Sequence, residues 1–316
     1  MKVFVAGGSG AIGRALVPRL VAAGHEVVAT TRWPAKVPWL ESLGATAAVL
    51  DALDEQAVLS AVRRHRPEVL MNQLTSLPPR YNPRRLGPWY AATSRLRVEG
   101  TRILLAAGAA VGATRFIYQS IAFMYAPVGP MVVDEQAPLT LDAPEPFGGA
   151  ARSTIDGERL STATDGINGV VLRYGQLYGP RTYFDRDGDF ARQARARMLP
   201  IVAGGSGVFS FLHVDDAATS AIAAMELGSG VYNVTDDDPA QARDWIPAFC
   251  AEVGAPPPWR IPAWPVRIAA GRFATSLLTD GRGASNVKAR RELGWSPTHP
   301  TWRNGFLAGS ASHSRQ

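Results

Sequence analysis

Hydrophobic and polar positions along the first half of the chain alternate between short β-type runs and amphipathic helical runs. The apolar run at residues 3–5 is followed by a glycine-rich turn and the amphipathic stretch RALVPRLVAAG. Further β-type runs alternate with helical stretches, at residues 26–31, 45–54, 68–76 and 115–120. This alternation predicts an α/β fold with a doubly wound parallel sheet, in which ligands bind at the carboxyl ends of the strands.

The glycine turn after the first run carries the strongest chemical signal. Gly7, Gly10 and Gly13 separate the strand from the helix. Glycine permits the tight turn and the close packing of helix on strand, and the unpaired N–H groups of a helix N-terminus attract phosphate. A strand, glycine turn and helix in this order predict dinucleotide binding. The cofactor contacts expected in the turn are Gly7, Ser9, Gly10, Ala11, Ile12 and Gly13.

The end of the second β-type run favours NADP(H) over NAD(H). NAD-selective sites place Asp or Glu there, whereas Arg accommodates a 2′-phosphate. Here the run ends in Thr30, Thr31 and Arg32, and Lys36 adds a second positive charge. We therefore expect Arg32 to bind the 2′-phosphate, with simple exposure of Arg32 as the alternative.

Three side chains at the ends of later runs complete the expected cofactor site. They are Asp51, at the adenine end, Gln73 and Ser120. Because the strands are expected to be parallel, their carboxyl ends share one edge of the sheet with Gly7.

The pattern becomes less regular after residue 173. Turn-rich stretches such as GVYNVTDDDPA follow, and the tail PPPWRIPAWPVRIAAGRF contains several prolines. We expect a dinucleotide-binding Rossmann domain over residues 1–173. Residues 174–316 are expected to form a smaller, irregular substrate-binding part that returns some elements to the main sheet.

The composition indicates where the protein is located and argues against a bound metal. The chain is 46% hydrophobic and 19% charged, and no apolar run approaches the roughly 18 residues of a membrane span. Its one cysteine, Cys250, excludes an internal disulfide. The five histidines are dispersed, and His213 precedes Asp215 and Asp216, which are expected to cap a helix. We expect a cytoplasmic protein with no membrane partner and no metal, and the oligomeric state stays open.

The net charge of +6 raises the question of a nucleic-acid partner. The basic residues are nearly all arginines scattered along the chain. The densest group, at residues 181–197, is interrupted by Asp185, Asp187 and Asp189. A solvated helix face explains this group better than a phosphate track, so no nucleic-acid partner is expected.

Several motifs occur along the chain in a fixed order. They are GGSGAIG, VEGTRILLAAG, YQSIAFMYA, LRYGQLYGP, FLHVDDAA and RELGWSP. The first three resemble the GxxGxxG, NVxGTxNLL and SSxxVYG motifs of the extended short-chain dehydrogenase/reductase family, close to nucleotide-sugar epimerases and dehydratases. The resemblance covers nearly the whole chain and implies a Rossmann fold with a nicotinamide dinucleotide.

The resemblance also implies a catalytic Tyr-x-x-x-Lys pair, in which the lysine lowers the pKa of the tyrosine. The stretch ARSTIDGERL aligns with the helix of that pair and places Ala150 at the tyrosine and Thr154 at the lysine. An alternative frame places Phe147 and Ala151 there. Neither frame gives an acid/base pair, so the chain is similar to the family as an atypical member.

Two further positions of the family pattern also differ. Aligning Tyr125 with the tyrosine of VYG places Ile121 at the catalytic Ser or Thr, with Ser120 one residue earlier. Arg97 occupies the position of the helix asparagine. Either catalysis has been lost, or the reaction obtains its proton elsewhere.

The first function that we consider is an NADPH-dependent ketoreductase. The alkoxide that forms must be neutralised or hydrogen-bonded. A substrate with an acidic hydroxyl beside the ketone would supply that proton itself, and aromatic polyketides offer this arrangement. The arginine-rich, lysine-poor composition resembles that of high-GC actinobacterial proteins, and the pattern resembles atypical ketoreductases that act on angucyclinones. The expected substrate is a bulky aromatic ketone of antibiotic biosynthesis.

Ser120 and Tyr125 are the candidate catalytic donors. Ser94, Tyr174 and Gln176 are expected to contact the substrate. The structural alternative is that Ser120 bonds only to backbone and that the two tyrosines form cavity walls.

The second function is a redox sensor of the NmrA type, which binds NADP(H) without turning it over. The missing catalytic residues agree with a sensor. The retained motifs of the C-terminal half favour the reductase, because that half builds a substrate cavity in the family.

Overall fold

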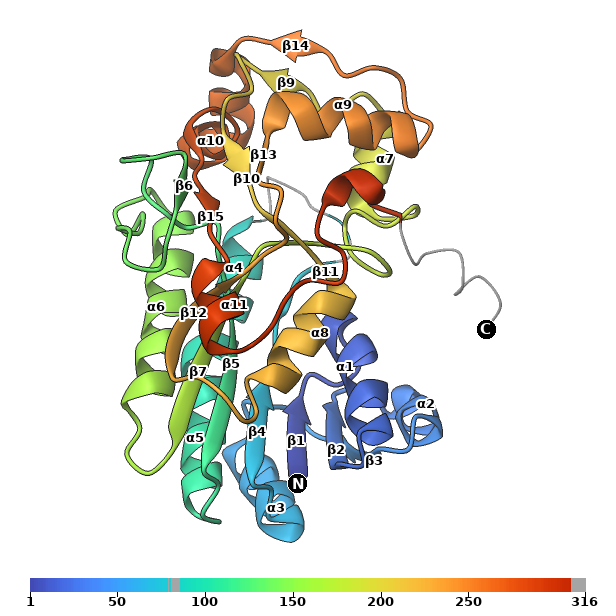
Figure 1. The fold of residues 1–316 in the computed structure, drawn as a ribbon, viewed down its shortest axis with the longest axis vertical. Coiled ribbons are helices and arrows are strands. Elements are labelled where there is room, and N and C mark those ends of the chain that lie inside the picture. The colour runs from blue at the N-terminus through green and yellow to red at the C-terminus, as the bar shows by residue number, and fades with distance from the viewer. Residues whose placement is uncertain (79, 81–85, 308–316) are drawn as a thin grey trace.

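The computed structural model describes residues 1–78, 80 and 86–307, and a seven-stranded parallel sheet forms its centre (Figure 1). The strand order is β12-β7-β5-β4-β1-β2-β3. The strands are β1 (Lys2–Ala6), β2 (Glu26–Thr31), β3 (Thr46–Val49), β4 (Val69–Asn72), β5 (Arg115–Ile121), β7 (Asn168–Tyr174) and β12 (Gly230–Val234). The doubly wound α/β fold predicted from the sequence is confirmed.

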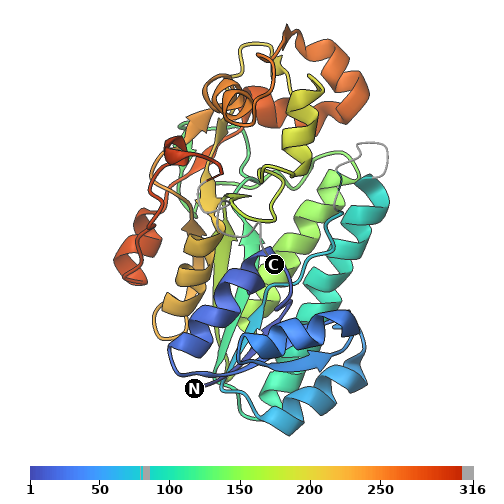
Figure 2. The ribbon, with the colours of Figure 1, turned by 90° about the vertical axis from the view of Figure 1, so that its right-hand side faces the viewer.

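Helices cover both faces of the sheet (Figure 2). Helices α1 (Ala11–Ala22) and α8 (Val214–Ala223) pack together on one face. The other face carries α3 (Glu55–His65), α4 (Leu86–Arg95), α5 (Thr101–Ala109) and α6 (Phe147–Ala163). In β1, the side chains of Val3 and Val5 pack in the hydrophobic core under α1 and α8, and those of Phe4 and Ala6 pack in the core on the opposite face. Because side chains alternate along a strand, a strand buried on both faces needs the unbroken apolar run that the sequence shows.

A π turn interrupts the helical stretch between β4 and β5. The turn η3 (Leu96–Gly100) lies between α4 and α5. Two strands end earlier than the pattern suggested, β3 at Val49 and β4 at Asn72, because the chain leaves the sheet before the apolar runs end.

The C-terminal part lies beyond the carboxyl ends of the strands (Figure 1). Its helices are α7 (Asp189–Arg195), α9 (Ala242–Glu252) and α10 (Ala263–Asp280), whereas α11 (Val287–Glu292) packs against β12 of the main sheet. Short strand pairs link it together, namely β8 (Gln176–Tyr178) with β11 (Phe211–His213), β9 (Ile201–Val202) with β14 (Arg260–Ile261), β10 (Val208–Phe209) with β13 (Ala240–Gln241), and β6 (Val132–Val133) with β15 (Gly283–Ala284). The remaining short elements are α2 (Val37–Ser42), η1 (Pro34–Lys36) and η4 (Trp302–Asn304). An aromatic core that includes Phe184, Phe211 and Trp245 fills this part.

Two elements from the second half of the chain join the sheet and one of its helical layers. Strand β12 pairs with β7, and α8 packs on α1. The proposed boundary at residue 173 remains a prediction.

The cap of α8 differs from the prediction. His213 directly precedes the helix as its N-cap, and its Nδ1 accepts the N–H of Asp215 at 3.2 Å. The carboxylate of Asp216 is fully buried and instead accepts the N–H groups of Thr298 and His299, at 2.7 and 2.9 Å. The prediction of a carboxylate cap was wrong, because the Asp216 carboxylate accepts hydrogen bonds from a distant segment of the chain and not from the start of α8.

Within the ranges that the structure describes, every helix is too short or too polar to cross a lipid bilayer.

Asp236, in the turn after β12, gives the fold a measurable pH dependence. It is 1% exposed, and burial raises its pKa to about 8 although the N–H groups of Asp238 and Trp302 bond to it. In the unfolded chain, the pKa of an aspartate carboxyl is about 3.9. Between those values the folded state holds more protons than the unfolded state, so stability falls as pH rises toward 8.

We expect Asp236→Asn to remove this contribution, since the amide stays neutral at every pH. Between pH 5 and about 8, the free energy of unfolding of this variant should fall less steeply with pH than that of the native protein. The two slopes should differ by up to about 1.4 kcal/mol per pH unit. Urea denaturation of both proteins across that range measures the slope. The exposed Asp244→Asn is the matched control, and equal slopes for Asp236→Asn and the native chain would contradict the prediction.

Candidate active site

The turn between β1 and α1 is closely packed on its neighbours. Gly7 has a φ of +92°, and a Cβ at Gly13 would lie 2.5 Å from the carbonyl oxygens of Gly7 and Gly8. The N–H of Gly7 donates to Oγ1 of Thr30 at 3.1 Å, which ties the turn to β2. No side chain caps α1 at Gly10. The N–H groups of the first helical turn are therefore available to an anion.

Gln73, which follows β4, lies against this turn. A Cβ at Gly7 would lie 2.7 Å from the carbonyl oxygen of Gln73. The Gln73 side chain is buried, and within the described residues neither its Nε2 nor its Oε1 makes a hydrogen bond of good geometry. The Tyr174 hydroxyl lies near, but it donates to the carbonyl of Ala217 at 3.3 Å. An unpaired buried amide is unfavourable unless a ligand bonds to it, so turn and amide together fit a dinucleotide.

Three basic side chains follow the glycine turn and β2 in the chain. Arg32 is exposed directly after β2, and Lys36 is half-buried in η1. Sequence reasoning missed Arg14, whose guanidinium stacks 4.1 Å from the centre of the Trp39 ring. Burial and the nearby charge of Arg181 lower the pKa of Arg14. An arginine directly after the third glycine was the available signal.

The other predicted contacts are spread along the same edge. Asp51 is exposed beyond β3 and accepts the N–H of Leu53 at 3.0 Å. Ser94 accepts a hydrogen bond from Ser153 at 2.8 Å, where α4 meets α6. Gln176 is half-buried at the start of β8.

Tyr174 differs from these residues because it belongs to the core. Its side chain is 1% exposed and packs among the apolar residues between the sheet and α1. Burial raises its pKa. The position is that of a core residue and not of a substrate contact.

The positions of the family's acid/base pair lie on α6 and carry no acid. Ala150 and Thr154 are both buried, and the Thr154 hydroxyl donates to the Ala150 carbonyl at 2.7 Å. The guanidinium of Arg97 donates to the same hydroxyl. In the alternative frame, the Phe147 ring packs 5.2 Å from that of Tyr90. Ile121, at the serine position, is half-buried at the end of β5.

Ser120 and Tyr125 belong to one buried polar network. Ser120 is fully buried and donates to Oε1 of Glu158 at 2.5 Å. Glu158 forms a buried two-point ion pair with Arg173, at 2.8 and 2.6 Å. The Tyr125 hydroxyl donates to Oδ1 of Asn233 at 2.6 Å and accepts from Arg173 at 3.1 Å. Burial raises the pKa of Tyr125. Both hydroxyls are therefore committed to internal partners.

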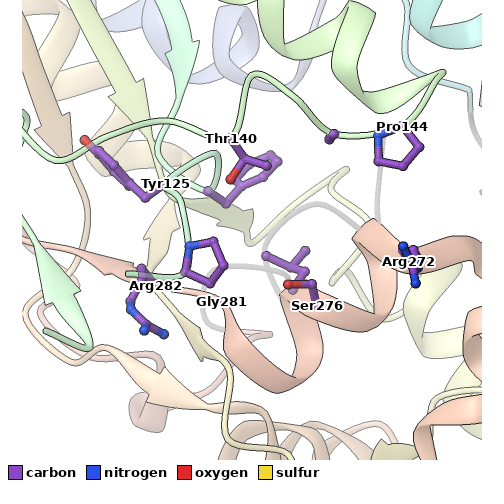
Figure 3. Close-up of a pocket in the computed structure, with 11 residues that line it drawn as sticks. Tyr125, Thr140, Pro144, Arg272, Ser276, Gly281 and Arg282 are labelled. Atoms are coloured by element: carbon purple, nitrogen blue, oxygen red, sulfur yellow. The ribbon is translucent and has the colours of Figure 1, made fainter. Parts of the chain in front are cut away.

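A pocket of about 160 Å³ opens beyond β5 (Figure 3). Phe123 and Tyr125 follow the strand and line it on one side, and Ser276 of α10 lines it on another. Arg272 and Arg282 lie at opposite sides of the pocket in Figure 3, and none of the described residues that line it is acidic. A cavity of about 150 Å³ is large enough for one benzene ring. The sequence pattern gave no signal for the contribution of α10.

His213, Asp215 and His299 bring possible metal-ligand atoms within 4.8 Å of one another. The Nδ1 of His213 already accepts the N–H of Asp215, and the His213 and His299 rings stack with centres 3.8 Å apart. This arrangement caps α8 and packs the tail, and we assign no metal to it.

Comparison with known proteins agrees with the motifs. The model of the NAD dependent epimerase/dehydratase family matches residues 3–235. The chain is 48% identical to a Streptomyces protein named 3-diazoavenalumate denitrifying reductase, covering 97% of this chain and 99% of that protein. It is 30% identical to the 2-alkyl-3-oxoalkanoate reductase of Stenotrophomonas maltophilia, covering 94% and 95%.

The structure of UDP-glucose 4-epimerase from Thermus thermophilus in complex with NAD superposes with a TM-score of 0.74 at 22% identity, covering 99% of this chain and 100% of that one. At this identity the likeness concerns the fold. The family resemblance inferred from the motifs is confirmed by the match over residues 3–235. The chain belongs to the NAD dependent epimerase/dehydratase family.

Proposed function

We propose that this protein is an NADPH-dependent reductase of aromatic compounds, whose reaction takes no proton from a protein acid. One observation carries the proposal. The closely packed glycine turn between β1 and α1 has the form that holds a dinucleotide, whereas Ala150 and Thr154 on α6 cannot exchange protons as the family's tyrosine and lysine do. The cytoplasmic location expected from the sequence agrees with NADPH as cofactor.

Bound NADPH would supply a hydride from its nicotinamide. The N–H groups at the start of α1 would hold the diphosphate, and Arg32 would pair with the 2′-phosphate. The unpaired amide of Gln73 would bond to the dinucleotide. The aromatic walls and cationic sides of the pocket beyond β5 would orient one ring of the substrate.

An aryl diazonium is the acceptor that best fits a site without an acid. Hydride adds to it, the carbon–nitrogen bond breaks, and N₂ leaves with the electron pair of that bond. The products are the arene and N₂, and the balance requires no proton. The name of the Streptomyces relative describes a denitrifying reductase of a diazo compound, which supports this acceptor.

A hydroxyaryl ketone, such as an aromatic polyketide of antibiotic biosynthesis, is the second candidate. Hydride addition gives an alkoxide, which takes its proton from the neighbouring substrate hydroxyl. The Stenotrophomonas relative is named a reductase of an oxo compound, which supports a ketone. The pocket takes about one ring, so the remainder of a bulky substrate would lie outside it.

Purified protein should consume NADPH in the presence of an aryl diazonium and release N₂ in equal amount. With NADPH deuterated at the transferred position, the label should appear on the ring carbon that lost nitrogen. A hydroxyaryl ketone, the matching ketone without the hydroxyl, and reactions without protein are the controls.

Turnover of the hydroxyaryl ketone alone would select the second candidate. Tight NADPH binding without turnover of either compound would contradict both, and would favour the NmrA-type sensor.

We expect the protein to bind NADPH at least about tenfold more tightly than NADH, because a guanidinium pairs with the 2′-phosphate by charge-assisted hydrogen bonds. Arg32→Ala should remove most of that preference and leave NADH affinity nearly unchanged. Calorimetric titration of both cofactors measures it. Arg63→Ala, on α3, is an arginine control, and equal affinities of the native protein for the two cofactors would overturn the role of Arg32.

We expect Ser120→Ala and Tyr125→Phe to lower kcat only modestly, by less than about tenfold. Both hydroxyls serve the buried network, so their loss should lower stability more than activity. Steady-state kinetics and thermal melting of each variant separate the two effects. A fall in kcat of several orders of magnitude, with stability retained, would identify a protein acid and contradict the proposed mechanism.

A further inference from the structure

Arg97 brings a positive charge to the place where the family pattern has its lysine. The side chain comes from η3 and is 8% exposed. Its Nη1 donates to Oγ1 of Thr154, a fully buried residue of α6 that aligns with the lysine. The two residues are 57 positions apart in the chain and meet because α4 and η3 pack along α6. The charge is therefore supplied by a different helix.

The environment of Arg97 differs from that of the other buried arginines. Arg173 is paired with the carboxylate of Glu158, and Arg115 donates to three backbone carbonyls, those of Ala224, Leu227 and Gly228. Among the described residues, Arg97 has the hydroxyl of Thr154 as its hydrogen-bond acceptor and forms no ion pair. Burial lowers the pKa of Arg97. The other guanidinium nitrogens of Arg97 are not among the fully buried polar atoms of the described residues that lack a partner, so they remain accessible to a polar ligand.

The local backbone also distinguishes this position. Arg97 lies in a π turn, and single π turns inside α-helices occur frequently at functional sites. The neighbouring contact between Ser94 and Ser153 continues the same polar seam between the two helices. The seam runs beside β5, whose carboxyl end adjoins that of β4 and the amide of Gln73.

The strand order of the sheet indicates which half of the dinucleotide would lie near this polar seam. The glycine turn and Arg32 follow β1 and β2, so the adenine half belongs on that side. A dinucleotide spans the point where the strand order reverses, between β1 and β4. Its nicotinamide half then lies over β4 and β5, on the side of Arg97.

We propose that Arg97 replaces the missing lysine from the neighbouring helix, and that its guanidinium donates hydrogen bonds to the nicotinamide nucleotide half of NADPH. Thr154 positions that guanidinium, since its hydroxyl accepts from Arg97 and donates to the Ala150 carbonyl. A lysine at 154 would place two like charges together, so Arg97 and Thr154 form a matched pair. This inference rests on NADPH as the cofactor of the proposed function.

The test replaces Arg97 and Thr154 by the asparagine and lysine of the family pattern. Arg97→Asn should weaken NADPH binding about tenfold to a hundredfold, because charge-assisted hydrogen bonds are lost. The affinity for adenosine 2′,5′-bisphosphate, which lacks the nicotinamide half, should not change. Adding Thr154→Lys to Arg97→Asn should restore most of the NADPH affinity. Calorimetric titrations of both ligands, with thermal melting of each variant, give the readout.

Arg115→Met is the matched control, because it removes a buried arginine at the opposite end of β5. It should lower stability and leave both affinities unchanged. Arg97→Gln provides a second neutral variant with the same expected result, should the asparagine fold poorly.

Native NADPH affinity in Arg97→Asn and Arg97→Gln would overturn the inference, as would an equal loss for the adenine fragment. A folded double variant without recovery would overturn the replacement of lysine. Failure of the native protein to bind NADPH would instead reject the proposed cofactor itself, so the two failures are distinguishable.

Discussion

The close contact between the β1–α1 turn and its neighbours is the constraint on which the candidate site depends. A Cβ at Gly13 would meet two carbonyl oxygens at 2.5 Å, and one at Gly8 would meet the Ala29 Cβ at 2.7 Å. Any larger side chain would therefore push α1 away from the sheet. With glycine present, the N-terminus of α1 stays at the carboxyl edge of the sheet, beside the unpaired amide of Gln73. The position of the dinucleotide and of everything that faces it follows from this contact.

Near this turn, the polar residues differ from those of the family pattern and have other partners. The serine and tyrosine nearest to the family pattern, Ser120 and Tyr125, join the buried ion pair of Arg173 and Glu158. A buried pair of this kind must keep all its hydrogen-bond partners, because loss of one leaves an uncompensated charge. The network holds β5, β7 and α6 together, and both hydroxyls are hydrogen-bonded within it. The cation at the active edge comes instead from Arg97.

Under the proposed function, hydride transfer without a protein acid restricts the substrates. The acceptor must either carry its own proton or form a product that needs none. A pocket with aromatic walls and arginines at opposite sides lies beyond the end of β5, and under the proposed function it would hold such an acceptor. Loss of the tyrosine and lysine is thus compatible with a specialised reductase as well as with a protein that only binds the cofactor.

Sequence by itself determined the sheet, the glycine turn and the absence of the acid/base pair. These features depend on residues close together in the chain: the alternation of apolar runs, four glycines within seven residues, and Ala150 with Thr154 one helical turn apart. It also placed Arg32 directly after β2. The cap of α8 was assigned to the wrong side chain, because Asp216 is held by a segment 82 to 83 residues further along the chain.

Only the tertiary structure decided which polar groups meet. Arg97 reaches Thr154 across 57 positions, Tyr125 reaches Asn233 across 108, and α10 supplies a wall of a pocket that begins after β5. Tyr174 looked like a substrate contact by its motif, yet its place at the end of β7 turns its ring into the core. Local pattern sets the periodicity and the turn chemistry of each element. The packing of helices on the sheet determines which side chains from distant elements share a buried space, and that is not encoded in any one stretch.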